Sequence, residues 1–220
     1  MESQERPVEA ESPKQEGWLS RLLEFIYGTL FQPVPTARRL AEERPLGMAA
    51  LVYLTATALT GSFNIIGLSR QVNVAVLAVV PAAMVMVLVT LSVAVWLVYT
   101  GLLQIIAELF GGRGKGLSLL AATGFAGLPS IFMPVVGLIS RAAGWGLEAL
   151  FSLLLSVWAM VLMVIAVRES HQLSTGRSIL TVLAPLVAGV FTVILLVIIV
   201  MATLASLPFL WDLPGLPGIF

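Results

Sequence analysis

Five long apolar runs constrain what this chain can fold into. They span Leu46–Leu68, Pro81–Ile106, Leu117–Ile139, Leu147–Val167 and Ile179–Leu204. A helix needs about 20 apolar residues, rising about 1.5 Å each, to cross a hydrocarbon core about 30 Å thick. Glu148, near a helix end, is the single acidic or basic residue in the five runs, and a charge in mid-membrane costs about 2.5–3.5 kcal/mol on insertion scales. The sequence therefore predicts an all-α integral membrane protein, a bundle of five spans.

The composition agrees with lipid as the principal partner of the chain. Hydrophobic residues make up 59% of the 220 residues and charged residues 11%, whereas soluble domains are about 45–50% apolar and about 25% charged. The chain has no cysteine, which excludes disulfides and thiolate metal sites. Its formal net charge is zero, so electrostatics give no reason to expect nucleic acid as a partner.

The basic residues predict how the chain is oriented. Ten of the twelve lysines and arginines lie before the first span, between the second and third, or between the fourth and fifth. The connections on the other side hold only Arg70 and Arg141. Because cytoplasmic loops carry the excess of Lys and Arg, we expect the amino terminus in the cytoplasm and the carboxyl terminus outside. In a prokaryote the membrane would be the plasma or inner membrane.

The segments outside the spans have three different characters. Residues 1–16 are polar and acidic, which predicts a disordered tail. Residues 17–45 predict cytoplasmic interfacial helices: the stretch GWLSRLLEFIYGTLFQ has an apolar helical stripe that begins at Trp18, and TARRLAEER follows with Arg38 and Arg39. The stripe suits either the membrane interface or packing across the bundle. Residues 205–220 form an apolar tail rich in proline and glycine on the outer face.

A glycine cluster, GGRGKG, precedes the third span at residues 111–116. A Walker phosphate loop needs Gly-Lys followed by Ser or Thr, after a strand. Here Gly116 follows Lys115, and a membrane helix precedes the cluster. We therefore expect a flexible cytoplasmic turn, in which Arg113 and Lys115 are attracted to anionic lipid head groups.

The third span itself is interrupted by small residues and prolines. They are Gly124, Gly127, Pro129, Pro134 and Gly137. Because proline removes a backbone donor, the freed carbonyls need partners, and such a helix belongs inside the bundle. Two functions remain open for it. Small residues at four-residue spacing favour close helix packing, and a broken helix also occurs in transporters, here for a neutral small solute.

No enzyme is predicted. The chain has one histidine, His171, in the polar stretch RESHQLSTGR, which we interpret as a solvated loop. Without a cysteine or a second histidine a metal site would lack ligands, and no G-x-S-x-G nucleophile elbow is present. We expect no catalytic residue, cofactor or metal.

These features together resemble the Yip-domain family, the Ypt-interacting multi-pass membrane proteins, in its prokaryote-like form. The likeness covers roughly residues 30–204: a proline-containing apolar segment, five spans, a basic glycine loop and GFAGLP within the third span. In that family Gly-Tyr followed by proline marks the third span. Gly124, Phe125 and Pro129 stand there in this chain.

The resemblance implies a non-enzymatic role in organising membrane or scaffolding partner proteins. Eukaryotic relatives are associated with Rab-type GTPases, vesicle traffic and membrane shaping. Their Asp-Leu-Tyr-Gly-Pro motif before the first span is replaced by FQPVPTARRL, which argues against GTPase binding. Other membrane proteins, or a second copy of the chain, remain as partners.

Overall fold

The computed structural model describes residues 17–69, 80–143 and 145–206, which are helical throughout apart from short turns. Its helices are α1 (Trp18–Phe31), α2 (Pro33–Glu43), α3 (Leu46–Ser69), α4 (Val80–Leu109), α5 (Gly116–Ala126), the short 3-10 helix η2 (Leu128–Phe132), α6 (Met133–Ala143), α7 (Trp145–His171) and α8 (Thr175–Ala205). Five segments of this part of the chain are long and apolar enough to cross a membrane. The predicted five-span helical bundle is confirmed. The tail segments 1–16 and 207–220, and the connection that holds Arg70, lie outside the described residues.

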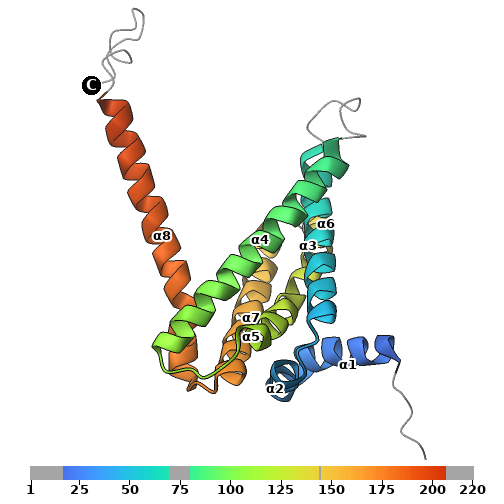
Figure 1. Ribbon diagram of the computed structural model, residues 1–220. Coiled ribbons are helices and arrows are strands. Elements are labelled where there is room, and N and C mark those ends of the chain that lie inside the picture. Colours follow the sequence, from blue (N-terminus) through green and yellow to red (C-terminus); the bar gives the residue numbers. More distant parts are fainter. Residues whose placement is uncertain (1–16, 70–79, 144, 207–220) are drawn as a thin grey trace, which may run out of the picture.

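The third span is a broken helix made of α5, η2 and α6. In the 18-residue apolar window of this span 61% of the residues are buried, against 22% or less in the corresponding windows of the other four spans. Pro129 lies in the first turn of η2, where a missing backbone N–H costs least because the first N–H groups of a helix have no partner inside it. Helices α3 and α7 pack on either side of this span (Figure 1).

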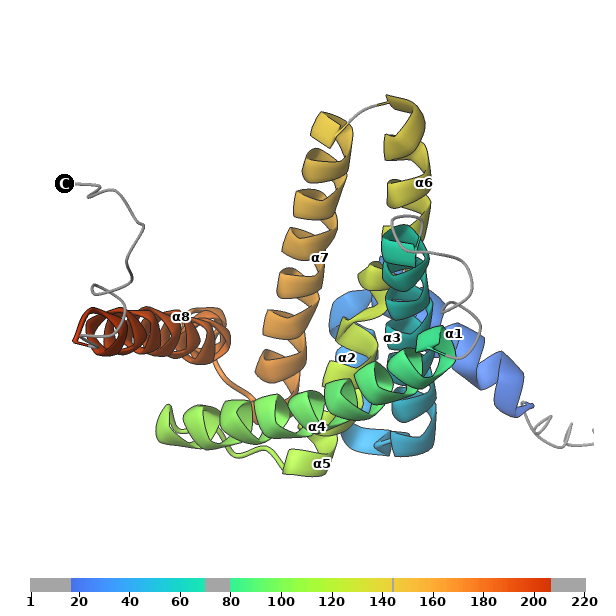
Figure 2. The ribbon, with the colours of Figure 1, turned by 90° about the horizontal axis from the view of Figure 1, so that it is seen from above.

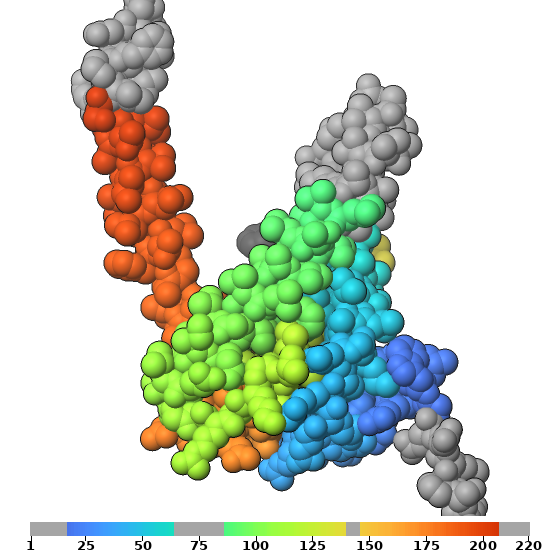
Figure 3. All heavy atoms as spheres, viewed as in Figure 1, coloured from blue at the N-terminus to red at the C-terminus, as the bar shows by residue number. Residues whose placement is uncertain are grey.

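Helix α8 leaves the bundle. It packs against α4 and α7 only near its start, and from Leu186 to Ser206 every residue is exposed. Figures 1 and 2 show α8 diverging from the other spans, and the space-filling view shows an open wedge between α8 and α4 (Figure 3). Because lipid tails are as apolar as the side chains, no hydrophobic force draws such a helix onto its neighbours. Ala188, for example, is exposed.

One end of the bundle gathers three connections that are far apart in the sequence. Helix α2 contacts α5 and α7 there, and the backbone N–H of Arg113 donates to the carbonyl of His171 (3.2 Å). The described segments that hold eight of the twelve basic residues thus meet at the same end. We call it the basic end.

One local expectation needs correction at the basic end. The stretch RESHQLSTGR is not a loop: α7 continues through His171 and α8 begins at Thr175, so three residues connect them. Helix α1 ends at Phe31, and α2 begins two residues later at Pro33. A proline in the first turn of a helix has the right φ and lacks only an N–H that would have no helical partner.

Candidate functional site

Helix α1 has three different faces. Leu22, Phe25 and Thr29 are buried against the bundle. Arg21 and Glu24 turn toward α2. The remaining face carries what we call the outer stripe, a row of apolar side chains at four-residue spacing that are 59% to 66% exposed: Leu19, Leu23, Tyr27 and Phe31. One side of α1 therefore packs on the bundle, and another side carries apolar residues that are exposed.

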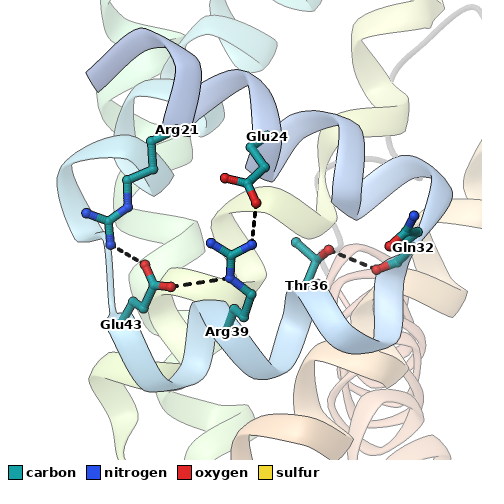
Figure 4. Close-up of polar contacts among 6 residues, drawn as sticks. All are labelled: Arg21, Glu24, Gln32, Thr36, Arg39 and Glu43. Atoms are coloured by element: carbon teal, nitrogen blue, oxygen red, sulfur yellow. Dashed lines mark hydrogen bonds and ion pairs between the residues drawn. The ribbon is translucent and has the colours of Figure 1, made fainter. Parts of the chain in front are cut away.

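Charged side chains hold α1 against α2 (Figure 4). Arg39 on α2 donates from Nη1 to Glu24 Oε1 (2.5 Å) and from Nε to Glu43 Oε1 (3.3 Å). Arg21 on α1 donates to the other carboxylate oxygen of Glu43. Both arginines also lie near the ring of Phe25, with guanidinium carbons 6.0 Å and 5.3 Å from its centroid. The polar face of α1 is thus occupied by α2, which leaves the outer stripe free to contact another phase or partner.

The pKa values follow from this network. The hydrogen bond from Arg39 to Glu24 raises the pKa of Arg39 above its ordinary value, against a smaller opposing effect of burial. Burial alone would raise the pKa of Glu43, but the hydrogen bonds and charges of Arg21 and Arg39 outweigh it and lower the pKa. Arg39 and Glu43 are therefore charged near neutral pH, and the network holds two arginines and two glutamates in direct contact.

The GFAGLP segment is where α1 meets the third span. The ring of Phe125 is fully buried, and its centroid lies 5.8 Å from that of Phe25 at 57°, a tilted arrangement favoured by aromatic rings. Gly124 lies against Ala49 of α3, so close that a Cβ on the glycine would stand 2.9 Å from the carbonyl oxygen of Ala49. Pro129 is buried in η2. These three residues therefore form a contact surface between helices.

The glycine loop 111–116 packs closely on His171. The histidine is 1% exposed, not solvated as expected, and its Nε2 lies 2.8 Å from Gln104 Oε1. Gln104 donates in turn to Glu108 (2.5 Å) and to the carbonyl of Gly114 (3.3 Å). A Cβ at Gly112 would stand 2.8 Å from the carbonyl oxygen of Ala107. The glycines therefore serve close approach between α4, the loop and the end of α7, which corrects the expectation of a flexible turn.

A polar cavity of about 500 Å³ opens beside this loop. Its lining includes Arg38, Arg44, Ser118, Arg168 and Glu169. Arg38 donates to Glu169 Oε2 from both Nε (3.1 Å) and Nη2 (3.0 Å), and Arg168 donates to Oε1 of the same carboxylate (2.9 Å). Arg44 donates to Ser118 Oγ (3.0 Å). Three guanidinium groups thus surround one cavity at the basic end.

The basic and aromatic residues expected to contact lipid or partners do not form one site. Trp18 is 51% exposed at the start of α1. Arg39 turns into the network with α1, whereas Arg38 lines the cavity. Arg113 and Lys115 are exposed on the glycine loop. Arg44 and Arg168 were not predicted from the sequence as cavity residues. The only signal that the sequence offers for them is that each lies at the end of an apolar span, beside a charged neighbour.

Polar side chains within the spans bond to one another. Trp96 Nε1 donates to Thr123 Oγ1 (3.1 Å), and Thr100 Oγ1 lies 3.2 Å from the same hydroxyl. Among the described residues no group of three or more His, Cys, Asp or Glu could hold a metal ion.

Five apolar spans, a broken and buried third span and a helical hairpin on one end define a polytopic helical membrane protein. The Yip1 domain model matches residues 27–198, which is most of the chain, so the protein belongs to the Yip1 domain family. The predicted kinship is confirmed, and members of this family are not known as enzymes. No curated protein and no solved structure matches the chain.

Proposed function

We propose that this protein is a non-enzymatic membrane organiser that uses α1 and α2 to shape one leaflet and to scaffold partner proteins at the cytoplasmic face. The observation that carries the proposal is the outer stripe of α1. Four large apolar side chains at least 59% exposed on one helix need either lipid or a partner to cover them.

The level at which α1 packs supports lipid as the cover. Phe25 on α1 meets Phe125, which is nine residues from the start of α5, or about 14 Å along that helix. Figure 1 shows α1 running across the direction of α3 at this level. A helix in that position has the outer stripe among acyl chains and adds volume to a single leaflet. Its hairpin partner α2 carries Arg38 on the polar side, where anionic head groups add attraction.

The first test measures where the outer stripe lies. Because the chain has no cysteine, a spin label can be attached to Leu23→Cys alone in the full protein in lipid vesicles. We expect collisions with oxygen to exceed those with a water-soluble nickel complex. Glu42→Cys, on the exposed side of α2, should show the reverse. Equal accessibility to the nickel complex at both positions would contradict the proposal that the outer stripe of α1 lies in lipid.

The second test asks whether the outer stripe is needed for contact with partners and for shaping the membrane. Leu19→Gln with Leu23→Gln keeps helix propensity and removes apolar contact worth about 3–6 kcal/mol. We expect the variant to lose partners captured by proximity labelling in cells and to lose any effect on the diameter of reconstituted vesicles. The matched control is Ile105→Gln with Leu109→Gln, two exposed residues near the basic end of α4. An outer-stripe variant that behaves like this control in both assays contradicts the proposal.

Transport of a neutral small solute through the third span is the less supported function. The hydroxyls of Thr100 and Thr123 and the indole of Trp96 are bonded to each other, as in a packed interior. Reconstituted vesicles that leak a solute above protein-free controls would reverse this preference.

A further inference from the structure

Arg168, near the end of α7, lines two cavities of opposite character. On one side lies the polar cavity at the basic end, with Arg38 and Arg44 in its lining. On the other side lies a groove of about 340 Å³ between α7 and α8. Arg168 is the one residue that the linings of these two cavities share. A ligand that occupied both would have a polar end and an apolar end, with Arg168 at the boundary.

The groove is apolar apart from its end at Arg168 and Thr175. Its walls are aliphatic side chains of the two helices: Met160, Val161, Val164 and Ile165 from α7, and Ile179, Val182 and Leu183 from α8. Arg168 Nη1 lies 3.4 Å from Thr175 Oγ1 across its polar end. The groove is therefore charged at one end and apolar along the rest of its length, as a phospholipid is.

The length of the groove fits one leaflet. Met160 precedes Arg168 by eight residues, or about 12 Å along α7, and half of a hydrocarbon core is about 15 Å. Beyond the groove α7 and α8 diverge (Figure 2), and the residues from Leu186 to Ser206 are exposed. An acyl chain in the groove can thus continue into the bilayer without meeting protein.

The charges at the polar end favour an anion, because the three arginines of the cavity lining outnumber its two carboxylates, Glu42 and Glu169. Glu169 is shared between Arg38 and Arg168, so one carboxylate balances two guanidinium groups. Arg44 has a hydroxyl partner, Ser118, and no carboxylate partner among the described residues. A phosphate accepts charge-assisted hydrogen bonds from arginine in the same manner as a carboxylate.

We infer that the two cavities form a binding site for one anionic phospholipid, with its phosphate on Arg168, an acyl chain between α7 and α8, and its head group toward Arg38 and Arg44. The site is separate from the outer stripe of α1, and it stands whether or not α1 shapes the membrane. Lipid held there would also fill the space that the short α7–α8 contact leaves open.

The test is native mass spectrometry of the full protein released from nanodiscs with equal amounts of phosphatidylglycerol and phosphatidylcholine. We expect one phosphatidylglycerol to remain bound to the wild-type protein. Arg168→Gln should lower its retention about tenfold, the effect of losing hydrogen bonds to a charged group. Arg168→Lys keeps the charge and should retain more lipid. Val164→Trp, which fills the groove from an accessible wall, should lower retention while leaving Arg168 in place.

The matched control is Lys115→Gln, which removes one exposed charge at the same end but lies outside both cavities. If it lowers retention as much as Arg168→Gln, the attraction is general and the site is refuted. Equal retention of both lipids also refutes it. If inorganic phosphate protects lipid-free protein against heat as well as phosphatidylglycerol does, the site holds a small anion only. A dimer that Val164→Trp dissociates, with lipid retention unchanged, would assign the groove to a second copy.

Discussion

Replacing Gly114 by alanine is expected to lower the thermal stability of the protein more than any other single change in the glycine loop. A Cβ at this position would overlap the backbone carbonyl oxygen of Ser170 and stand 2.7 Å from the ring of His171. A backbone atom cannot rotate away, so the loop must lift. Lifting breaks the hydrogen bonds from Gln104 to the carbonyl of Gly114 and from the N–H of Arg113 to His171. Together these effects cost about 2–4 kcal/mol.

Gly116→Ala is the matched control for this prediction. A Cβ on Gly116 would meet only the side chain of Gln104, at an ordinary 3.8 Å, and alanine favours the helix that begins there. The measurement is the fraction of detergent-solubilised protein that stays monodisperse after heating. If Gly114→Ala and Gly116→Ala melt at the same temperature, the glycine loop is not packed on His171 as described.

The five spans could be predicted from the sequence because the length and apolar composition of each run indicate, without its neighbours, that the run lies in lipid. A run such as Ile179–Leu204 is apolar on every side whether or not it packs, and α8 is indeed exposed along most of its length. Length and composition therefore suffice for the spans. They do not fix depth or packing, which is why the same apolar composition describes the buried α5 and the exposed α8.

The contacts within the basic end could not be predicted, because they join residues that are far apart in the sequence. Arg38 and Glu169 are 131 positions apart, and His171 and Gln104 are 67 apart. A polar stretch such as RESHQLSTGR looks like a solvated loop because sequence shows polarity and not partners. In the fold, Nε2 of His171 and the carboxylate of Glu169 bond to side chains of other segments, and α7 continues through both residues.

Helix α1 shows a third kind of limit. The sequence shows which positions of α1 are apolar. It does not show that they form two faces, one buried and one exposed. Phe25 is buried against the third span and Leu23 is exposed, although the two are only two residues apart. The polar face could be assigned only once α2 lay along it, with Arg39 between Glu24 and Glu43.

Two glycines of the GFAGLP segment should respond oppositely to alanine. Gly124 lies where α5 crosses α3, and its new Cβ would stand 2.9 Å from both the Cβ and the carbonyl oxygen of Ala49. Small residues let helices approach this closely in membranes, where packing rather than the hydrophobic effect holds them together. Gly124→Ala must therefore separate α3 from α5, at a cost of about 1–3 kcal/mol.

Gly127, three residues later, should tolerate the same change. Nothing lies within 4 Å of its new Cβ, and its backbone is already right-handed helical, with φ −77° and ψ −4°. Gly127→Ala should raise stability by about 0.4–1 kcal/mol, because alanine has fewer unfolded conformations to lose. The two variants can be compared by reversible unfolding in mixed micelles. Since both glycines precede Pro129 in one short segment, a shared loss would mean that the segment needs flexibility at both positions, whereas opposite signs attribute the effect at Gly124 to its contact with Ala49.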